Sequence, residues 1–357
     1  MKPGKLVILV VAAAVMAALA FWTNRQAQAT PPSIIGRKLL PRLDLESVAR
    51  VEIARGGAPI VLLRADDGWE AKNLFGYPAD VSKLQTALLT LSELKIGEVA
   101  RGVNIDTNAT LVDLQGASGK PLATLRLGNH SSADRSGFRS PRGRYVAVAG
   151  DAHVYLVKDE LEAFDGAAEG WVNSQLLGIQ SSDIQTIELA SPTGAVLTLS
   201  REGGTLHLPG LSTNEEFDAS KSYGVESAFC YLSFAGVADP KLGDAQTGLA
   251  TPSTYRVKLK NGDLYTARIG SAAASGDRYL RLDAVLAPPG TNATAQAEQA
   301  TRKAELEQKF ARWTYLVPAT TAENMTRTRA ELVKPRVAAT NATATSEAPT
   351  APGGLPE

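Results

Sequence analysis

Cysteine and histidine are scarce in this sequence. Among 357 residues there are one cysteine, Cys230, and three histidines. A single cysteine excludes an intramolecular disulfide, so an exported chain of this kind must be stabilised by packed cores. The histidines lie far apart and lack the spacing of zinc ligands, which argues against a metal site. Cys230 itself fits either a small buried side chain or a thiol that pairs with another chain.

An excess of charge of either sign is also missing. The chain has 37 basic and 37 acidic side chains. Domains that bind nucleic acid usually carry a clear basic excess, so no nucleic acid partner is expected. The nucleophile elbow of serine hydrolases and the glycine loop of ATPases are absent from the sequence. We therefore expect a protein that is not an enzyme and that needs no cofactor.

One long apolar run is present near the N-terminus. Residues 6–22 carry no charge, and Lys2 and Lys5 precede them. A helix of this length nearly crosses a hydrocarbon core of roughly 30 Å, and the positive-inside rule keeps the N-terminus in the cytoplasm. We expect a single-pass protein of the inner (cytoplasmic) membrane, with the bulk of the chain in the periplasm or another extracytoplasmic space.

The first thirty residues leave two interpretations open. Residues 27–29 read Ala-Gln-Ala, which resembles the cleavage site of a secretory signal peptide. The apolar run is longer than the roughly 7–15 residues of a usual signal peptide, and Trp22 stands where an interfacial aromatic would stand. Residues 1–29 are thus interpreted as a signal anchor with its flank, with cleavage after Ala29 as the alternative. Either one exports the remainder.

The rest of the chain repeats one pattern. Strand-like alternation around residues 48–53 and 60–64 returns at 184–189 and 196–201, and each pair of strands is followed by a helix with one apolar face. The spacing stays similar until the last strand, before which the second copy has gained about 25 residues. The predicted fold class is therefore α+β: a tandem duplication of an antiparallel-sheet-plus-helix unit, preceded by one N-terminal transmembrane helix.

Domain boundaries follow from this repeat. The predicted parts are a tether at 30–43, a first repeat at 44–170, a second repeat at 171–333 with a helical insertion at 288–312, and a disordered tail at 334–357.

Two surfaces are candidates for binding. The stretch from 131 to 143 and the residue after it are rich in arginine, and a mobile basic loop could contact phospholipid headgroups or acidic envelope polymers. The alternative is a solvated hairpin tip. The candidate anion contacts are Arg135, Arg139, Arg142 and Arg144.

The insertion offers the second candidate surface. Residues 298–313 read as a charged helix with a narrow apolar stripe. The stripe could meet a partner protein, or the added helix could dock on its own domain. Its members are Leu306, Phe310 and Trp313.

Several motifs occur in the order expected of one family. They are Gly68-Trp69, Tyr77-Pro78-Ala79-Asp80, the strand ends Leu127-Gly128 and Ile269-Gly270, Val154-Tyr155-Leu156-Val157, and Gly248-Leu249-Ala250-Thr251-Pro252. Over roughly residues 44–325 the chain resembles the domain-of-unknown-function 4340 family. That resemblance implies a membrane-anchored extracytoplasmic protein, often encoded beside ABC transporter components of the gliding-motility type, with no catalytic residues to carry over. The first copy departs from the Gly-Leu-x-x-Pro motif at residues 102–105.

Together these features predict an accessory or scaffold protein of an envelope transport complex. Residues 6–22 would hold it in the membrane, and ABC transporter subunits would be its partners. The alternative function is that of an extracytoplasmic binder of anionic glycan or lipid, acting through the stretch from Arg135 to Arg144.

Overall fold

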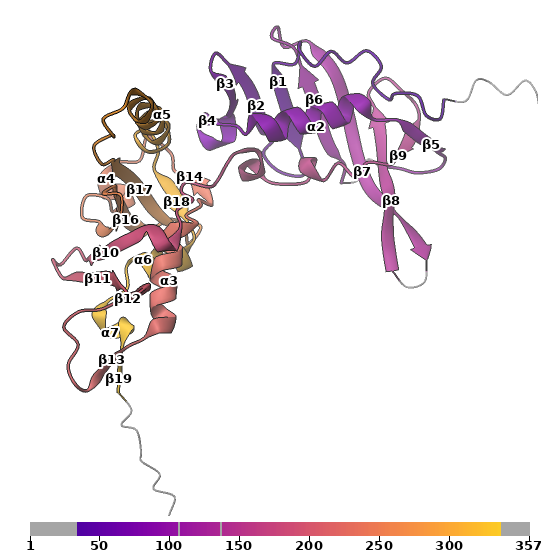
Figure 1. The fold of residues 1–357 in the computed structure, drawn as a ribbon. Helices are drawn as coiled ribbons and strands as arrows, with labels where there is room; N and C mark the ends of the chain where they lie inside the picture. Colours follow the sequence, from indigo (N-terminus) through magenta and orange to yellow (C-terminus); the bar gives the residue numbers. More distant parts are fainter. Residues whose placement is uncertain (1–33, 106–107, 136–137, 337–357) are drawn as a thin grey trace, which may run out of the picture. The chain divides into compact units, whose positions relative to one another are not determined.

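The computed structural model describes residues 34–105, 108–135 and 138–336. Within them the chain is mixed α+β, with large antiparallel sheets and few helices (Figure 1). It divides into two compact units between Asn173 and Ser174. The predicted membrane segment at 6–22 and most of the predicted tail lie outside the described residues. None of the helices in the described residues is long and apolar enough to cross a membrane.

The first unit is built on a nine-stranded antiparallel sheet with the order β4-β3-β2-β1-β6-β7-β8-β9-β5. Its strands are β1 (Arg50–Ala54), β2 (Ile60–Ala65), β3 (Gly68–Ala71), β4 (Tyr77–Pro78), β5 (Ile96–Ala100), β6 (Thr110–Gln115), β7 (Pro121–Arg135), β8 (Phe138–Val148) and β9 (Val154–Val157). Its helical segments are η1 (Lys72–Leu74), α2 (Val81–Glu93), η2 (Glu162–Phe164) and η3 (Ala168–Trp171).

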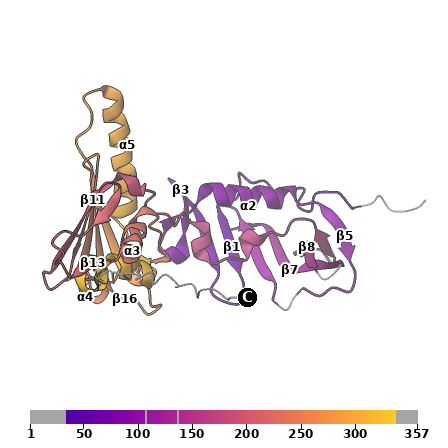
Figure 2. The same ribbon diagram turned by 60° about the horizontal axis from the view of Figure 1, so that its bottom comes forward.

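Helix α2 covers one face of this sheet (Figure 2). It begins directly after Asp80, because the Asp80 carboxylate accepts a hydrogen bond from the backbone N–H of Lys83 at 3.1 Å. The side chains that the period of 3.6 marks as apolar are buried under it: Leu84, Ala87, Leu88 and Leu91. The strands alternate accordingly. In β1, for example, Val51 and Ile53 are buried, whereas Arg50 and Glu52 form a part-exposed ion pair on the other face.

The predicted tether contributes to this unit. The backbone of residues 36–39 hydrogen-bonds to residues 94–96 beside β5, and Leu39 and Leu40 are buried. Residues 36–40 are therefore part of the folded unit and not a free linker. The prediction of a tether was wrong for residues 36–40. A short stretch near prolines is typical of a linker, but Leu39 and Leu40 fill the core.

The second unit contains an eight-stranded antiparallel sheet with the order β12-β11-β10-β15-β16-β17-β18-β14. Its strands are β10 (Ile184–Ala190), β11 (Val196–Glu202), β12 (Thr205–His207), β14 (Gly236–Val237), β15 (Ser253–Leu259), β16 (Leu264–Ala272), β17 (Arg278–Val285) and β18 (Tyr315–Val317), with a separate pair β13 (Glu215–Phe217) and β19 (Val333–Pro335). Its helical segments are η4 (Ser181–Asp183), α3 (Ala219–Cys230), α4 (Asp244–Thr247), α5 (Ala293–Phe310), α6 (Ala319–Met325) and α7 (Arg329–Leu332).

The two sheets share one order of strands. Reading from β3 to β5 in the first unit and from β12 to β14 in the second, every strand has a counterpart with the same neighbours. Register agrees as well: Arg144 pairs with Val157, and Arg278 pairs with Val317. The helices also match, since Asp218 caps α3 as Asp80 caps α2. These correspondences match the strands of the two sheets and the main helices of the two units one to one, apart from β4.

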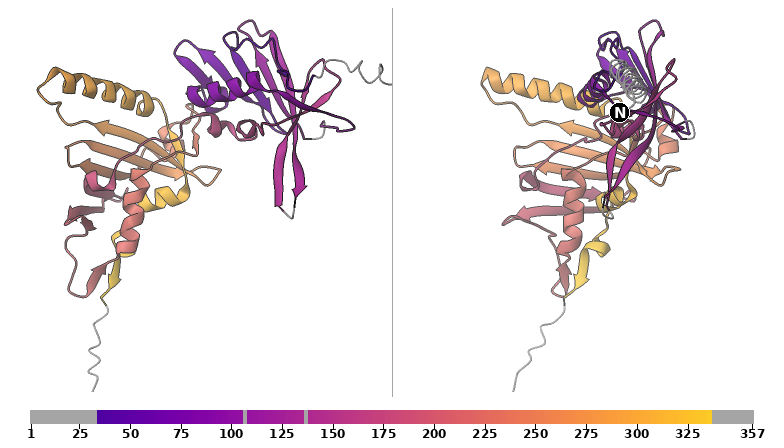
Figure 3. Two further views of the ribbon diagram at one scale, coloured as in Figure 1. Left: turned by 45° about the vertical axis from the view of Figure 1, so that its right-hand side comes forward. Right: turned by 90° about the vertical axis from the view of Figure 1, so that its right-hand side faces the viewer.

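Strands β7 and β8 are much longer than their counterparts β16 and β17. Beyond the residues that pair with β6 and β9, they continue as a two-stranded ribbon that reaches the register pair Arg135 and Phe138 (Figure 3). We define this ribbon, residues 131–135 and 138–143, as the arm. The sequence suggested a loop here, because its serines, glycines and proline resemble a connection.

Candidate functional site

The most elaborate polar cluster of the first unit is built around Arg144. This side chain is only 3% exposed, at the point where β8 joins the sheet. The preceding residue, Gly143, has a φ of 134°, and a Cβ there would lie 1.9 Å from the carbonyl oxygen of Val157. Only glycine permits so close an approach between β8 and β9. The local backbone thus turns Arg144 into the interior of the unit.

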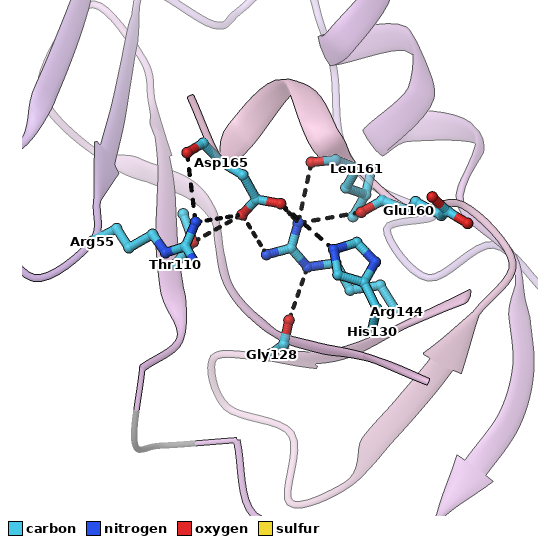
Figure 4. A network of polar contacts seen from close by, with 8 residues as sticks. All are labelled: Arg55, Thr110, Gly128, His130, Arg144, Glu160, Leu161 and Asp165. Atoms are coloured by element: carbon cyan, nitrogen blue, oxygen red, sulfur yellow. Dashed lines mark hydrogen bonds and ion pairs between the residues drawn. The ribbon is translucent and has the colours of Figure 1, made fainter. Parts of the chain in front are cut away.

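Asp165 faces the buried guanidinium. Arg144 donates Nη1 to Asp165 Oδ2 at 2.8 Å and Nη2 to Asp165 Oδ1 at 2.7 Å (Figure 4). This two-point geometry matches the planar fork of arginine to the two carboxylate oxygens. The carboxylate is 24% exposed, so the pair lies at the boundary between core and solvent.

The remaining donors of Arg144 bind backbone carbonyls. Nε donates to Gly128 O at 2.9 Å, and Nη1 also donates to the carbonyls of Glu160 and Leu161, both at 3.2 Å. Leu161 has a φ of 54°, a left-handed conformation that is uncommon for a leucine. These bonds fix the return segment, which we define as residues 158–171 after β9, against the sheet.

Three further side chains contact Asp165, two of them exposed and one buried. Arg55 Nη1 lies 3.3 Å from Oδ1, His130 Nε2 lies 3.6 Å from Oδ2, and the buried Thr110 hydroxyl donates to Oδ1 at 3.4 Å. Arg55 and His130 are 55% and 38% exposed. With Arg144 and Asp165 they form what we name the Asp165 cluster.

Electrostatics keep Asp165 ionised. Burial by itself would raise the pKa of this carboxyl, but the hydrogen bonds and charge of Arg144 oppose that effect. The charges of Arg55 and His130 act in the same direction, and the net pKa is lowered from its ordinary value. The cluster therefore holds a carboxylate anion among cations and serves to attach the return segment to the sheet.

A groove of about 760 Å³ lies between α2 and the return segment. It is lined by Ser82, Lys83, Thr86, Ala87 and Thr90 of α2 and by Leu161, Ala163, Phe164, Gly170 and Trp171 of the return segment. Of these residues Ala87, Leu161, Phe164 and Trp171 are buried and apolar. Phe164 and Trp171 contact one another at the floor, with ring centroids 5.5 Å apart. The groove is thus apolar at its base and accessible from solvent through the exposed face of α2.

One side of this groove is acidic. Asp159, Glu160 and Glu162 all line it, and Asp159 and Glu162 are exposed. In Figure 4 the carboxylate of Glu160 points away from Asp165, although the Glu160 carbonyl binds Arg144. The Lys83 ammonium lies near the carbonyls of Gly170 and Val172, at 3.4 and 3.3 Å. Within the part of the chain that the structure describes, no cationic side chain pairs with the three acidic residues.

In the second unit a helix occupies the position that corresponds to the groove. After β18 the chain forms α6, which packs against α3. Thr86 of the groove corresponds to Gly224, since each stands equally far beyond the capping aspartate of its helix. A Cβ on Gly224 would lie 2.8 Å from the side chain of Asn324 in α6. Helix packing thus occupies in one unit the space that stays open in the other.

The Asp165 cluster also differs between the units. Arg278 corresponds to Arg144 and likewise donates Nε to a glycine carbonyl, that of Gly270, at 2.8 Å. Among the described residues Arg278 forms no ion pair with a carboxylate. The glycine contact is therefore common to both units, whereas the ion pair of Arg144 has no counterpart at Arg278.

The predicted anion contacts have different positions in the structure. Arg144 is buried and bound by protein acceptors, so it does not face solvent as an anion contact would. The backbone places Arg135, Arg139 and Arg142 on the arm. The repeated Arg-Tyr pair at 144 and 278 was a signal in the sequence that Arg144 has a structural role.

The predicted partner stripe is largely covered by its own unit. Phe310 and Trp313 are buried, and Leu306 is half-buried. Helix α5 begins earlier than predicted, at Ala293, and ends before Trp313. It is attached at its middle, where Arg302 Nη1 pairs with the buried Asp263 at 2.8 Å. The structure supports the interpretation that this helix docks on its own domain.

Comparison with known proteins gives one match. The family described as domain of unknown function (DUF4340) matches residues 69–247, from β3 in the first unit to α4 in the second. The chain belongs to the DUF4340 family. The prediction made from the sequence motifs is thus confirmed. No curated protein and no solved structure matches the chain.

Several residues of the Asp165 cluster in this DUF4340 chain could not be recognised from the sequence. Asp165, Thr110, Arg55 and His130 stand in four separate segments, with no common spacing. The strand ends Leu127-Gly128 and Ile269-Gly270 carried a signal beside that of the repeated Arg-Tyr pair. At both glycines an added Cβ would clash, with Ile105 in the first unit and with the Thr247 carbonyl in the second.

Proposed function

We propose that this DUF4340 protein is a non-enzymatic accessory or scaffold protein of an envelope transport complex. Residues 6–22 would anchor it in the inner membrane, and both units would lie on the extracytoplasmic side. Its partners would be subunits of an ABC-type transporter of the gliding-motility kind, which is what the family resemblance implies. The shared strand order of the two sheets supports the idea that the units are copies of one ancestral unit.

The observation that carries this proposal is the arm. Beyond its junction with the sheet, the ribbon pairs only with itself, because β6 ends opposite Leu127 and β9 ends opposite Arg144. A two-stranded ribbon without a third strand or a covering helix is marginally stable in water. Contact with another protein would supply the missing packing, and the second unit has no ribbon of comparable length among its described strands.

Deletion of the arm tests the proposal. Residues 132–142 are replaced by Asn-Gly, a dipeptide that closes a tight hairpin. We expect the variant to fold and to reach the membrane, but to lose ABC transporter subunits when it is purified from detergent-solubilised membranes. The matched control replaces the corresponding short turn of the second unit, residues 273–277, in the same way, and should keep them. Unchanged co-purification after deletion of the arm, or isolation of the unaltered chain alone, would contradict the proposal.

The second candidate function is binding of anionic glycan or lipid. It is favoured by the position of Arg135, Arg139 and Arg142 on the arm, although Arg144 no longer belongs to this set. Replacing the three arginines with serine should release the protein from anionic liposomes or from acidic glycan if this function is correct. Equal retention of both proteins would eliminate it.

A further inference from the structure

The groove between α2 and the return segment has a counterpart in the second unit, where helix α6 occupies it. In the second unit α6 lies against α3 at Gly224, whereas in the first unit the return segment forms only the short turns η2 and η3. The same scaffold therefore accepts a helix at this position. In the first unit the neighbouring chain supplies none, and the space of about 760 Å³ remains.

The lining of the groove indicates what would fit. Its base is apolar, with Ala87, Leu161, Phe164 and Trp171, and these residues are buried beneath it. Its acidic side, formed by Asp159, Glu160 and Glu162, favours cations near an apolar surface. An amphipathic helix that carries lysine or arginine beside its apolar stripe matches both features.

We propose that this groove binds a short cationic amphipathic helix of a partner protein, at the position where the second unit packs its own α6. This inference rests on the proposed function, because it assumes that a partner exists, and it names the chemistry of that partner. The C-terminal stretch of the same chain is a poorer occupant, since residues 337–357 contain two glutamates and neither lysine nor arginine. The Asp165 cluster supports the groove indirectly, because it holds the return segment that forms one wall.

The first test uses a defined probe. A synthetic helical peptide of about 14 residues, made of leucine, alanine and lysine, is compared with the same peptide carrying glutamate for lysine. We expect the lysine peptide to bind the full-length protein and the glutamate peptide to bind at least about tenfold more weakly. Equal binding of the two peptides would overturn the proposal.

Two variants locate the binding. Thr86→Trp places a large side chain in the groove, and Gln85→Trp adds the same side chain at an exposed neighbouring position of α2 that does not line it. The first should weaken the lysine peptide about tenfold, and the second should leave it unchanged. A double charge reversal, Asp159→Lys with Glu162→Lys, should reverse the preference toward the glutamate peptide. Its control is Glu98→Lys, an exposed position in β5 outside the groove. If Thr86→Trp and Gln85→Trp behave alike, the groove is not the site.

The natural occupant is identified in the intact membrane. A photo-crosslinking amino acid is placed at position 86 or, as the control, at position 85 of the full chain, and the attached peptide is sequenced. The proposal predicts a cationic amphipathic segment of another protein at position 86 only. Attachment to residues 337–357, to a second copy of this chain or to lipid would overturn it, as would equal yields at both positions. If arm deletion still abolishes co-purification while Thr86→Trp does not, the proposed function stands and the groove is excluded.

Discussion

Asp165→Asn is the most informative change in the first unit. It preserves the size of the side chain but removes the charge that faces Arg144. The guanidinium is cationic and only 3% exposed, so a buried cation loses its anion. Breaking a buried pair in this way costs about 3–5 kcal/mol. Because Asp165 is 24% exposed, we expect about 3 kcal/mol, the lower end of that range. For a unit of this size that is a fall in Tm of roughly 10 °C.

Hydrogen exchange of the full-length protein measures this effect locally. Amides of β8, β9 and the return segment should exchange faster in Asp165→Asn, while amides of β16 and β17 in the second unit serve as an internal control. Glu188→Gln removes an ion pair with Arg256 whose two side chains are 35% and 50% exposed. It should cost less than about 1 kcal/mol, because surface pairs contribute little. The double variant Arg144→Met with Asp165→Leu should recover part of the loss, because it leaves no unpaired charge.

The same pair predicts a dependence on pH. A carboxyl whose pKa is lowered by folding stabilises the protein above the ordinary value of 3.8, and this contribution is lost as the pH falls through the lower folded value. The difference in stability between the unaltered protein and Asp165→Asn should therefore be constant near pH 7 and shrink below about pH 4. Urea unfolding at a series of pH values measures it. The reasoning is refuted if Asp165→Asn costs no more than Glu188→Gln, or if the difference does not change with pH.

Two other changes should separate roles that look alike in the sequence. Gly143→Ala should disrupt the pairing of β8 with β9, because the new Cβ would meet the Val157 carbonyl. Gly150→Ala, at a φ of 85° but in open space, should lower the free energy of unfolding by only about 1 kcal/mol. Thermal unfolding compares the two variants, and an equal loss of stability in both would contradict this. Cys230 is buried, and burial followed by the nearby Glu226 charge raises the pKa of its thiol to about 11. It should therefore react very slowly with a maleimide at pH 7.5 and rapidly in urea, and fast labelling of the native protein would show that the thiol is accessible.

The regular elements could be predicted because their signals are local. Apolar period and a capping aspartate define α2, and alternation defines β1 and β10. The repeat then predicted the strands of the second sheet from those of the first. For Cys230 the sequence left two interpretations open, and the structure supports the small buried side chain.

The Asp165 cluster could not be predicted because it depends on tertiary contacts. Arg144 and Asp165 meet only after β8, β9 and the return segment have folded back, and no spacing rule relates them to Arg55 or Thr110. Composition was misleading in the arm, where serine, glycine and proline resemble a loop, yet the backbone remains paired. For the stripe of the insertion the sequence left two interpretations open, and the burial of Phe310 supports docking on its own unit.

The pairing of residues 36–39 beside β5 limits how far the first unit can stand from a membrane. With residues 6–22 in the bilayer, only about a dozen residues connect the lipid to the point where the chain is fixed, and even fully stretched they reach roughly 45 Å. The folded body would then work close above the lipid headgroups. A transporter that it serves would have to offer a contact surface for the first unit at that height.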